Sequence, residues 1–100
     1  MTIESPFLPN YGSGVTVAPG VVAASTTLAN KTKSVVITNL SSSVVSYVRV
    51  SAAGTAATTA DFPVLPSNKV VLGKADDDLI VSYITSSGTG SIHIMAGEGY

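Results

Sequence analysis

The stretch KSVVITNLSSSVVSYVRVS, residues 33–51, decides the fold class of this 100-residue chain. Two runs rich in β-branched residues flank a polar break at residues 41–43. Valine and isoleucine lose side-chain freedom in a helix but pack well on a pleated surface, so both runs favour β-strands. A short polar break between two such runs is typical of an antiparallel hairpin, which we predict here. Its expected core side chains are Val35, Ile37, Val48 and Val50.

Further strand signals follow on both sides of this stretch. Alternating or β-branched runs occur at residues 15–17, 21–28, 69–74, 79–85 and 91–96. The last two runs flank the sequence SSGTG, which predicts a second hairpin. About seven or eight short antiparallel strands with turn signals roughly every 8–12 residues predict an all-β domain. We expect one β-sandwich over residues 15–100, and both the jelly roll and the immunoglobulin-like sandwich fit this pattern.

The middle of the chain contains two less regular segments. Residues 52–60 are almost all alanine, threonine and glycine, so we predict a surface loop with no large side chain to bury. Residues 61–66 contain two prolines, each of which lacks a backbone donor, so this segment is expected to be an edge strand or an extended crossing. We expect the ring of Phe62 to close one end of the core.

Charge and composition limit the classes of function. Eleven residues are charged, the net charge is −1, and the five cationic residues are dispersed along the chain. Binding to a phosphate backbone requires a basic face, so we expect no nucleic-acid partner. No apolar run approaches the roughly 20 residues of a membrane span, and the N-terminus lacks the features of a signal peptide. We therefore expect a soluble protein made in a cytoplasm, without a membrane partner.

The residue types needed for catalysis or metal binding are scarce. The chain has no cysteine and one histidine, His93, which lies between two isoleucines in a predicted strand. No nucleophile-elbow or phosphate-cradling glycine motif is present. We expect no enzyme activity, no cofactor and no small-molecule substrate. The acidic run Asp76–Asp78 lacks the alternate spacing of a calcium loop, so we interpret it as a solvated turn; contact with a cation or with a neighbour's lysine stays open.

Residues 1–14 differ from the rest of the chain. Prolines and glycines interrupt any regular period there, yet the segment contains several large apolar side chains. We predict an extended N-terminal arm, which either folds back over its own core or lies across a neighbouring subunit. The arm contributes three of the expected protein-interface residues, Phe7, Leu8 and Tyr11.

Three further interface candidates lie outside the arm. Tyr47 and Arg49 share the face of their strand opposite the expected core face. Exposed tyrosine and arginine side chains are enriched at protein interfaces, but they also pack on ordinary surfaces. Tyr100 ends the sequence after two glycines and an acid. We expect the two ends of the chain to make the main contacts.

Several segments resemble small capsid-decoration (cement) proteins and related minor virion proteins of tailed bacteriophages. The similar segments lie within residues 33–100 and include TTADFPVLP, LIVSYITSSGTGSIHI and the ending AGEGY. The resemblance implies a β-sandwich or jelly roll that binds outside the capsid and holds major capsid protein subunits together, often as a dimer or trimer. It also implies synthesis in the bacterial host and a place on the virion exterior. No site residues are implied.

Two other functions fit the same sequence. The chain could be a carbohydrate- or receptor-binding module of a phage tail, but it has no tryptophan and its four tyrosines are not clustered in sequence. Sugar stacking normally requires an aromatic platform. The chain could also be a head–tail neck component. The number of copies in each virion separates a neck component from a decoration protein.

Overall fold

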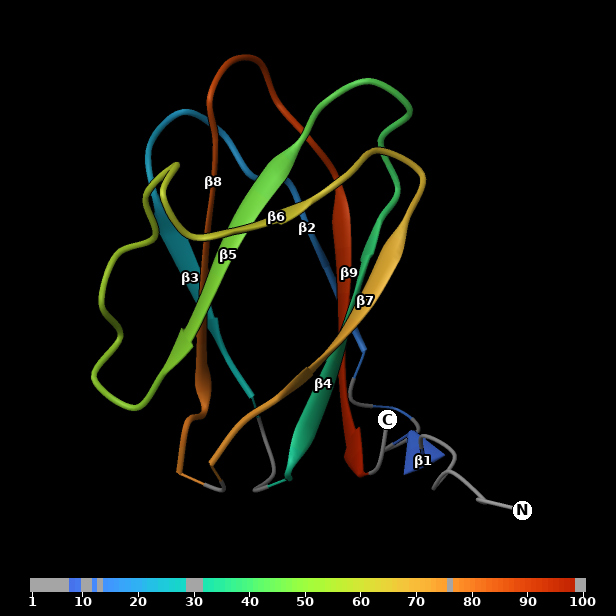
Figure 1. Ribbon diagram of the computed structural model, residues 1–100, viewed down its shortest axis with the longest axis vertical. Coiled ribbons are helices and arrows are strands. Elements are labelled where there is room, and N and C mark those ends of the chain that lie inside the picture. The colour runs from blue at the N-terminus through green and yellow to red at the C-terminus, as the bar shows by residue number, and fades with distance from the viewer. Residues whose placement is uncertain (1–7, 10–11, 13, 29–31, 76, 99–100) are drawn as a thin grey trace.

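Two antiparallel β-sheets pack face to face in the computed structural model (Figure 1). The structure describes residues 8–9, 12, 14–28, 32–75 and 77–98. These residues form β-strands, turns and loops but no helix, so the predicted all-β sandwich is confirmed. The described strands are β1 (Leu8–Pro9), β2 (Val15–Val17), β3 (Ala24–Thr27), β4 (Ser34–Asn39), β5 (Ser46–Ser51), β6 (Phe62–Val64), β7 (Lys69–Gly73), β8 (Ile80–Thr85) and β9 (Ile92–Glu98).

The strand order is that of a jelly roll. The first sheet has the order β1-β9-β4-β7, with β2 also paired to β9, and the second has the order β3-β8-β5-β6. The pairs β5–β6, β4–β7, β3–β8 and β2–β9 are nested like the rungs of one long hairpin. The loop of residues 52–61 forms its tip. Rolling this hairpin up brings β4 beside β9 and β5 beside β8. The topology therefore selects the jelly roll over the immunoglobulin-like sandwich.

Both predicted hairpins are wrong. β4 and β5 lie in different sheets, and so do β8 and β9. Each pair is joined by a six-residue connection, residues 40–45 and 86–91, which is long enough to cross the roughly 10 Å between packed sheets. Three of these strands, β4, β5 and β8, thereby gain two antiparallel partners and β9 gains three, whereas a simple hairpin provides one. The strands themselves were predicted correctly, but their partners were not.

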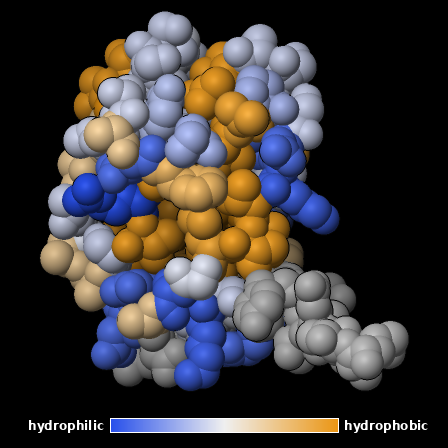
Figure 2. All heavy atoms as spheres, in the orientation of Figure 1, coloured by the Kyte–Doolittle hydropathy of each residue, from blue (hydrophilic) through white to orange (hydrophobic). Residues whose placement is uncertain are grey.

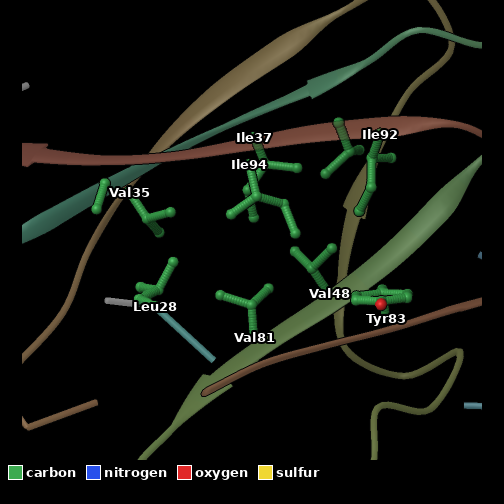
Figure 3. Close-up of a cluster of buried hydrophobic side chains, with 10 residues drawn as sticks. Leu28, Val35, Ile37, Val48, Val81, Tyr83, Ile92 and Ile94 are labelled. Carbon is green, nitrogen blue, oxygen red and sulfur yellow. The ribbon is translucent and has the colours of Figure 1, made fainter. Parts of the chain in front are cut away.

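The core lies between the two sheets and is almost entirely aliphatic. Figure 3 shows Ile37 and Ile94 of the first sheet pointing toward Val48 and Val81 of the second. Each of these side chains is fully or almost fully buried, which contributes about 1.5–3 kcal/mol per side chain. The expected core residues Val35, Ile37 and Val48 are buried, and Val50 is partly buried against them. The hydroxyl of Tyr83 lies 3.2 Å from the Thr26 hydroxyl.

The expectation for Phe62 is wrong. Its side chain is 46% exposed, whereas Val64 of the same strand is fully buried. β6 is an edge strand that pairs only with β5, so no further strand covers the ring of Phe62 at its start. The tip loop of the long hairpin instead folds over the outer face of the second sheet, where Ala57 N donates to the buried Ser82 hydroxyl at 2.8 Å.

Candidate interaction surface

Four loops gather at one end of the sandwich, the upper end in Figure 1. They are the connections β2–β3, β4–β5, β6–β7 and β8–β9, which all follow even-numbered strands. In a jelly roll these strands run in the same direction, so the loops that follow them meet. We call this surface the loop end; it comprises residues 18–23, 40–45, 65–68 and 86–91.

Backbone hydrogen bonds join the four loops of the loop end to one another. Thr85 N donates to Gly20 O and Gly90 N donates to Pro19 O, both at 2.8 Å. Leu40 N donates to Ser91 O at 2.8 Å, and Ser67 N donates to Ser41 O at 2.9 Å. Each loop is thus fixed to at least one neighbour. Because the loops are held in place before a partner arrives, binding through them costs little ordering entropy.

Asn39 anchors the loop end from inside. This residue ends β4 and its side chain is 1% exposed. Its Nδ2 donates to Val44 O at 2.8 Å and to Val64 O at 2.9 Å, and its Oδ1 accepts from Ser41 N at 3.0 Å. One amide therefore connects the first sheet to the β4–β5 crossing and to the end of β6 in the second sheet.

The loop end combines exposed aliphatic side chains with an absence of charge. Four large aliphatic side chains there are between 54% and 78% exposed: Val21, Val22, Leu40 and Leu65. The 22 residues of the four loops include no lysine, arginine, aspartate or glutamate. Uncharged groups are cheaper to remove from water than charged ones, and burial of aliphatic groups is favourable. This end is therefore suited to contact with another protein.

Charged residues lie at the opposite end of the sandwich. Around the start of β4, Lys33 N donates to the Glu98 carboxylate at 3.2 Å and Lys74 Nζ donates to Thr32 O at 2.5 Å. Asp77 and Asp78 follow in the turn between β7 and β8. Figure 2 shows several strongly hydrophilic residues at this lower end, whereas the top of the upper end presents mostly weakly hydrophilic and hydrophobic ones. The four loops of the loop end therefore differ from the opposite end in having no charged residue.

The residues of the loop end were missed as interface candidates. Val21 and Val22 were assigned to a strand, but β3 begins only at Ala24 and both valines lie in the preceding loop. The sequence contained a signal that they lie in a loop, because both follow the Pro19-Gly20 turn directly. Leu40 likewise lies beside three serines, and Leu65 precedes Pro66. A large aliphatic residue at a turn position rarely belongs to the core. This pattern in the sequence could have identified the four residues as exposed.

Arg49, an expected interface residue, is engaged within the chain. It lies on the outer face of the second sheet, as predicted, and its Nη2 and Nε lie 2.9 and 3.0 Å from Asp61 Oδ1. Asp61 Oδ2 in turn accepts from Thr58 N at 2.8 Å. The pair therefore fastens the tip loop to β5. Tyr47, on the same face, is partly buried opposite Pro63 and Ile84.

The Asp61 carboxylate is expected to make part of the free energy of unfolding depend on pH. The backbone hydrogen bond from Thr58 and then the Arg49 guanidinium hold the pKa of the Asp61 carboxyl below its ordinary value of 3.8. A lowered pKa stabilises the folded state above pH 3.8, and this contribution is lost as the pH falls through the folded-state pKa. Asp61→Asn should therefore lose less stability than the wild type between pH 6 and acid pH. Urea unfolding across this range measures the difference, and parallel pH profiles would contradict the assignment.

The described part of the predicted arm lies at the end opposite the loop end. Leu8 pairs with Glu98 and Pro9 with Gly97, so this part of the arm extends its own first sheet beside the last residues of β9 (Figure 1). The structure thus brings part of the arm close to the C-terminal segment. Three expected contact residues, Phe7, Tyr11 and Tyr100, lie outside the described residues.

Ionisable side chains do not converge on a catalytic or metal centre in the described part of the chain. No group of three histidine, aspartate or glutamate side chains there could hold a metal ion together. Asp78 Oδ2 accepts from Ala75 N at 3.3 Å within its own turn, and Asp76 lies outside the described residues. His93 lies between Thr16 and Thr38 in the first sheet.

Comparison with known proteins identifies no family for this chain. No protein-family model and no curated protein sequence matches it. Among the residues described by the structure, no helix is long and apolar enough to cross a membrane.

Proposed function

We propose that this chain is a structural virion protein that binds the outside of a phage capsid and stabilises contacts between major capsid protein subunits. The observation that supports this proposal is the loop end, a pre-formed surface with exposed aliphatic side chains and no charge. We infer that this end makes the main contact with the shell, and that the arm at the opposite end adds a further contact.

The architecture suits such a role. A jelly roll closes its hydrophobic core with two sheets and presents its loops at the ends, so an end-on contact leaves the core unchanged. The loop end is joined by backbone hydrogen bonds, which lowers the entropic cost of binding. A subunit that contacts two neighbouring capsid proteins at once gains further from effective concentration. Many modest contacts of this kind would stabilise a shell.

The described aromatic side chains favour protein contact over sugar binding. Tyr83 is buried and its hydroxyl contacts Thr26. Tyr47 pairs with Pro63 and Phe62 pairs with Val48, and since Tyr47 and Val48 are adjacent in β5, the two rings point to opposite faces of the sheet. They therefore do not form a shared platform on which a sugar ring could stack.

Electron cryo-microscopy of the virion, with this subunit located in the reconstruction, tests the proposal. We expect copies distributed over the outer surface of the capsid, with the loop end toward the shell. Co-sedimentation of the purified protein with shells lacking it should show saturable binding. A single ring of copies at the neck or on the tail, together with no binding to shells, would overturn the proposal.

Deletion of residues 2–13 is expected to weaken capsid occupancy while leaving the sandwich folded. The segment lies before β2, and its described strand, β1, contributes only two residues to the first sheet. Binding isotherms to shells measure the occupancy, and urea unfolding measures the fold. Equal occupancy of the deleted and full-length proteins would show that the arm makes no capsid contact and that the predicted contact residues Phe7, Leu8 and Tyr11 have another role.

A further inference from the structure

The edge strand β7 differs from the other sheet edges in length and chemistry. It has five residues, Lys69-Val70-Val71-Leu72-Gly73, and among the strands that the structure describes it pairs with β4 alone. Among the other edge strands of the described residues, β2 and β6 have three residues each, β6 contains Pro63, and β3 is the polar sequence ASTT. Natural proteins normally protect sheet edges by shortness, proline or charge. β7 lacks this protection except for the charge of Lys69.

The hydrogen bonds flanking β7 show which of its backbone groups point outward. Asn39 N donates to Asn68 O at 2.7 Å, and Lys74 N donates to Lys33 O at 2.9 Å. In an antiparallel ladder hydrogen-bonded and non-hydrogen-bonded pairs alternate, so Val70 and Leu72 also direct their N–H and C=O toward β4. Lys69, Val71 and Gly73 therefore direct theirs away from the sheet, along the free edge.

These outward groups are self-complementary about Val71. If a second copy of β7 pairs antiparallel with Val71 opposite Val71, then Lys69 lies opposite Gly73 and each outward residue faces an outward residue. Three outward N–H groups in each of two copies could then form six hydrogen bonds across the axis, in which each Lys69 N–H exchanges its local bond to Asn68 Oδ1 (2.9 Å) for a bond to Gly73 O of the second copy. A two-fold axis requires such a self-matching patch.

Side chains and charge favour the same register. The two Lys69 side chains would be offset by four residues, roughly 13 Å, which exceeds the screening length of about 8 Å at physiological salt. Val71, which is 38% exposed, would pack against its own copy. Val70 and Leu72 pack against the core and are partly buried. Figure 2 shows hydrophobic residues where β7 crosses this face.

We propose that two copies of this chain pair through β7 about a two-fold axis at Val71. The first sheets of the two copies then form one continuous antiparallel sheet across the axis. The partner is a second copy because the register, the hydrogen-bonding groups and the charges of β7 all match themselves. This dimer does not depend on capsid binding, since the β7 edge and the loop end are different surfaces. An edge-to-edge contact is small, so we expect dissociation in the micromolar range.

Val71→Pro tests the pairing through the backbone. Proline removes an outward N–H and leaves the ladder to β4 complete, so the monomer should fold. Sedimentation velocity over a concentration series should show a monomer–dimer equilibrium for the wild type and a dissociation constant at least about tenfold higher for Val71→Pro. Ser25→Pro is the matched control, because Leu28 N donates to Leu79 O and Ser25 therefore points its N–H outward on the β3 edge. It should dimerise like the wild type.

A charge-pair experiment tests the axis itself and does not rely on proline. Val71→Lys and Val71→Glu each place like charges opposite each other, so either variant alone should be monomeric where the wild type is dimeric. A mixture of the two should recover a heterodimer. A wild type that stays monomeric into the millimolar range, a dimer that survives both lysine and glutamate at residue 71, or a dimer lost in Ser25→Pro would each overturn the proposal.

Discussion

Asn39→Ala is expected to lower the free energy of unfolding by about 3–5 kcal/mol. The substitution removes three hydrogen bonds at once and leaves Val44 O, Val64 O and Ser41 N without these partners. Loss of a partner costs about 1–3 kcal/mol for each group that stays buried, and some of these groups will gain water because the site is next to the loops. Urea unfolding monitored by tyrosine fluorescence measures the change.

Asn68→Ala is the matched control for this prediction. Asn68 is exposed, and its Oδ1 accepts only a local bond from Lys69 N at 2.9 Å. We expect a loss of at most about 0.5 kcal/mol, as for most surface substitutions. A similar, small cost for Asn39→Ala would show that the amide of Asn39 does not hold the two sheets together at the loop end, and the description of the loop end as a rigid surface would then be wrong.

The double variant Val22→Asp, Leu40→Asp is expected to weaken binding to capsid shells by at least about 100-fold. Both side chains are more than half exposed, so the substitutions should leave the fold intact. In the proposed complex they would bury aliphatic surface, and full burial of a valine or leucine side chain contributes about 1.5–3 kcal/mol. Two buried aspartates would add a desolvation cost. Titration of shells with labelled protein measures the affinity.

The control for the second variant carries the same added charge elsewhere. Ser25→Asp, Thr27→Asp places two aspartates on exposed positions of β3, outside the four loops of the loop end. We expect nearly unchanged affinity for shells. If this control loses as much affinity as the double variant at the loop end, general charge repulsion explains the result. If only deletion of residues 2–13 reduces occupancy, the capsid contact lies at the opposite end of the sandwich.

Strand positions were predictable because each strand has a local signature. In β4 and β5 the alternation of side chains identified Val35, Ile37 and Val48 as buried residues, and the structure confirms them. Strand partners had no such signature. Asn39 illustrates the difference: in the sequence it is one polar residue before a serine-rich break, whereas in the fold its amide joins three segments. Local patterns do not encode which of several equally apolar strands lies next to another.

The candidate surface was less predictable than the fold. Tyr47 and Arg49 were correctly placed on the outer face of β5, but Arg49 is bound to Asp61, 12 residues further along the chain. Val22 and Leu40 are 18 residues apart in sequence, and only the rolling of the long hairpin brings their loops to one end. Exposure of these side chains is a property of the assembled loops, and no short-range pattern measures it.

The sequence by itself determined the all-β class, the short strands and most of the aliphatic core, because β-branching, alternation and turn residues act over a few neighbouring positions. Only the tertiary structure decided that residues 33–51, with their two β-branched runs, form a crossing between two sheets instead of a hairpin. That choice depends on the free energy of all strand pairings together, since β4 and β5 each gain two partners when the chain rolls up. The same choice created the loop end and left β7 as a free edge.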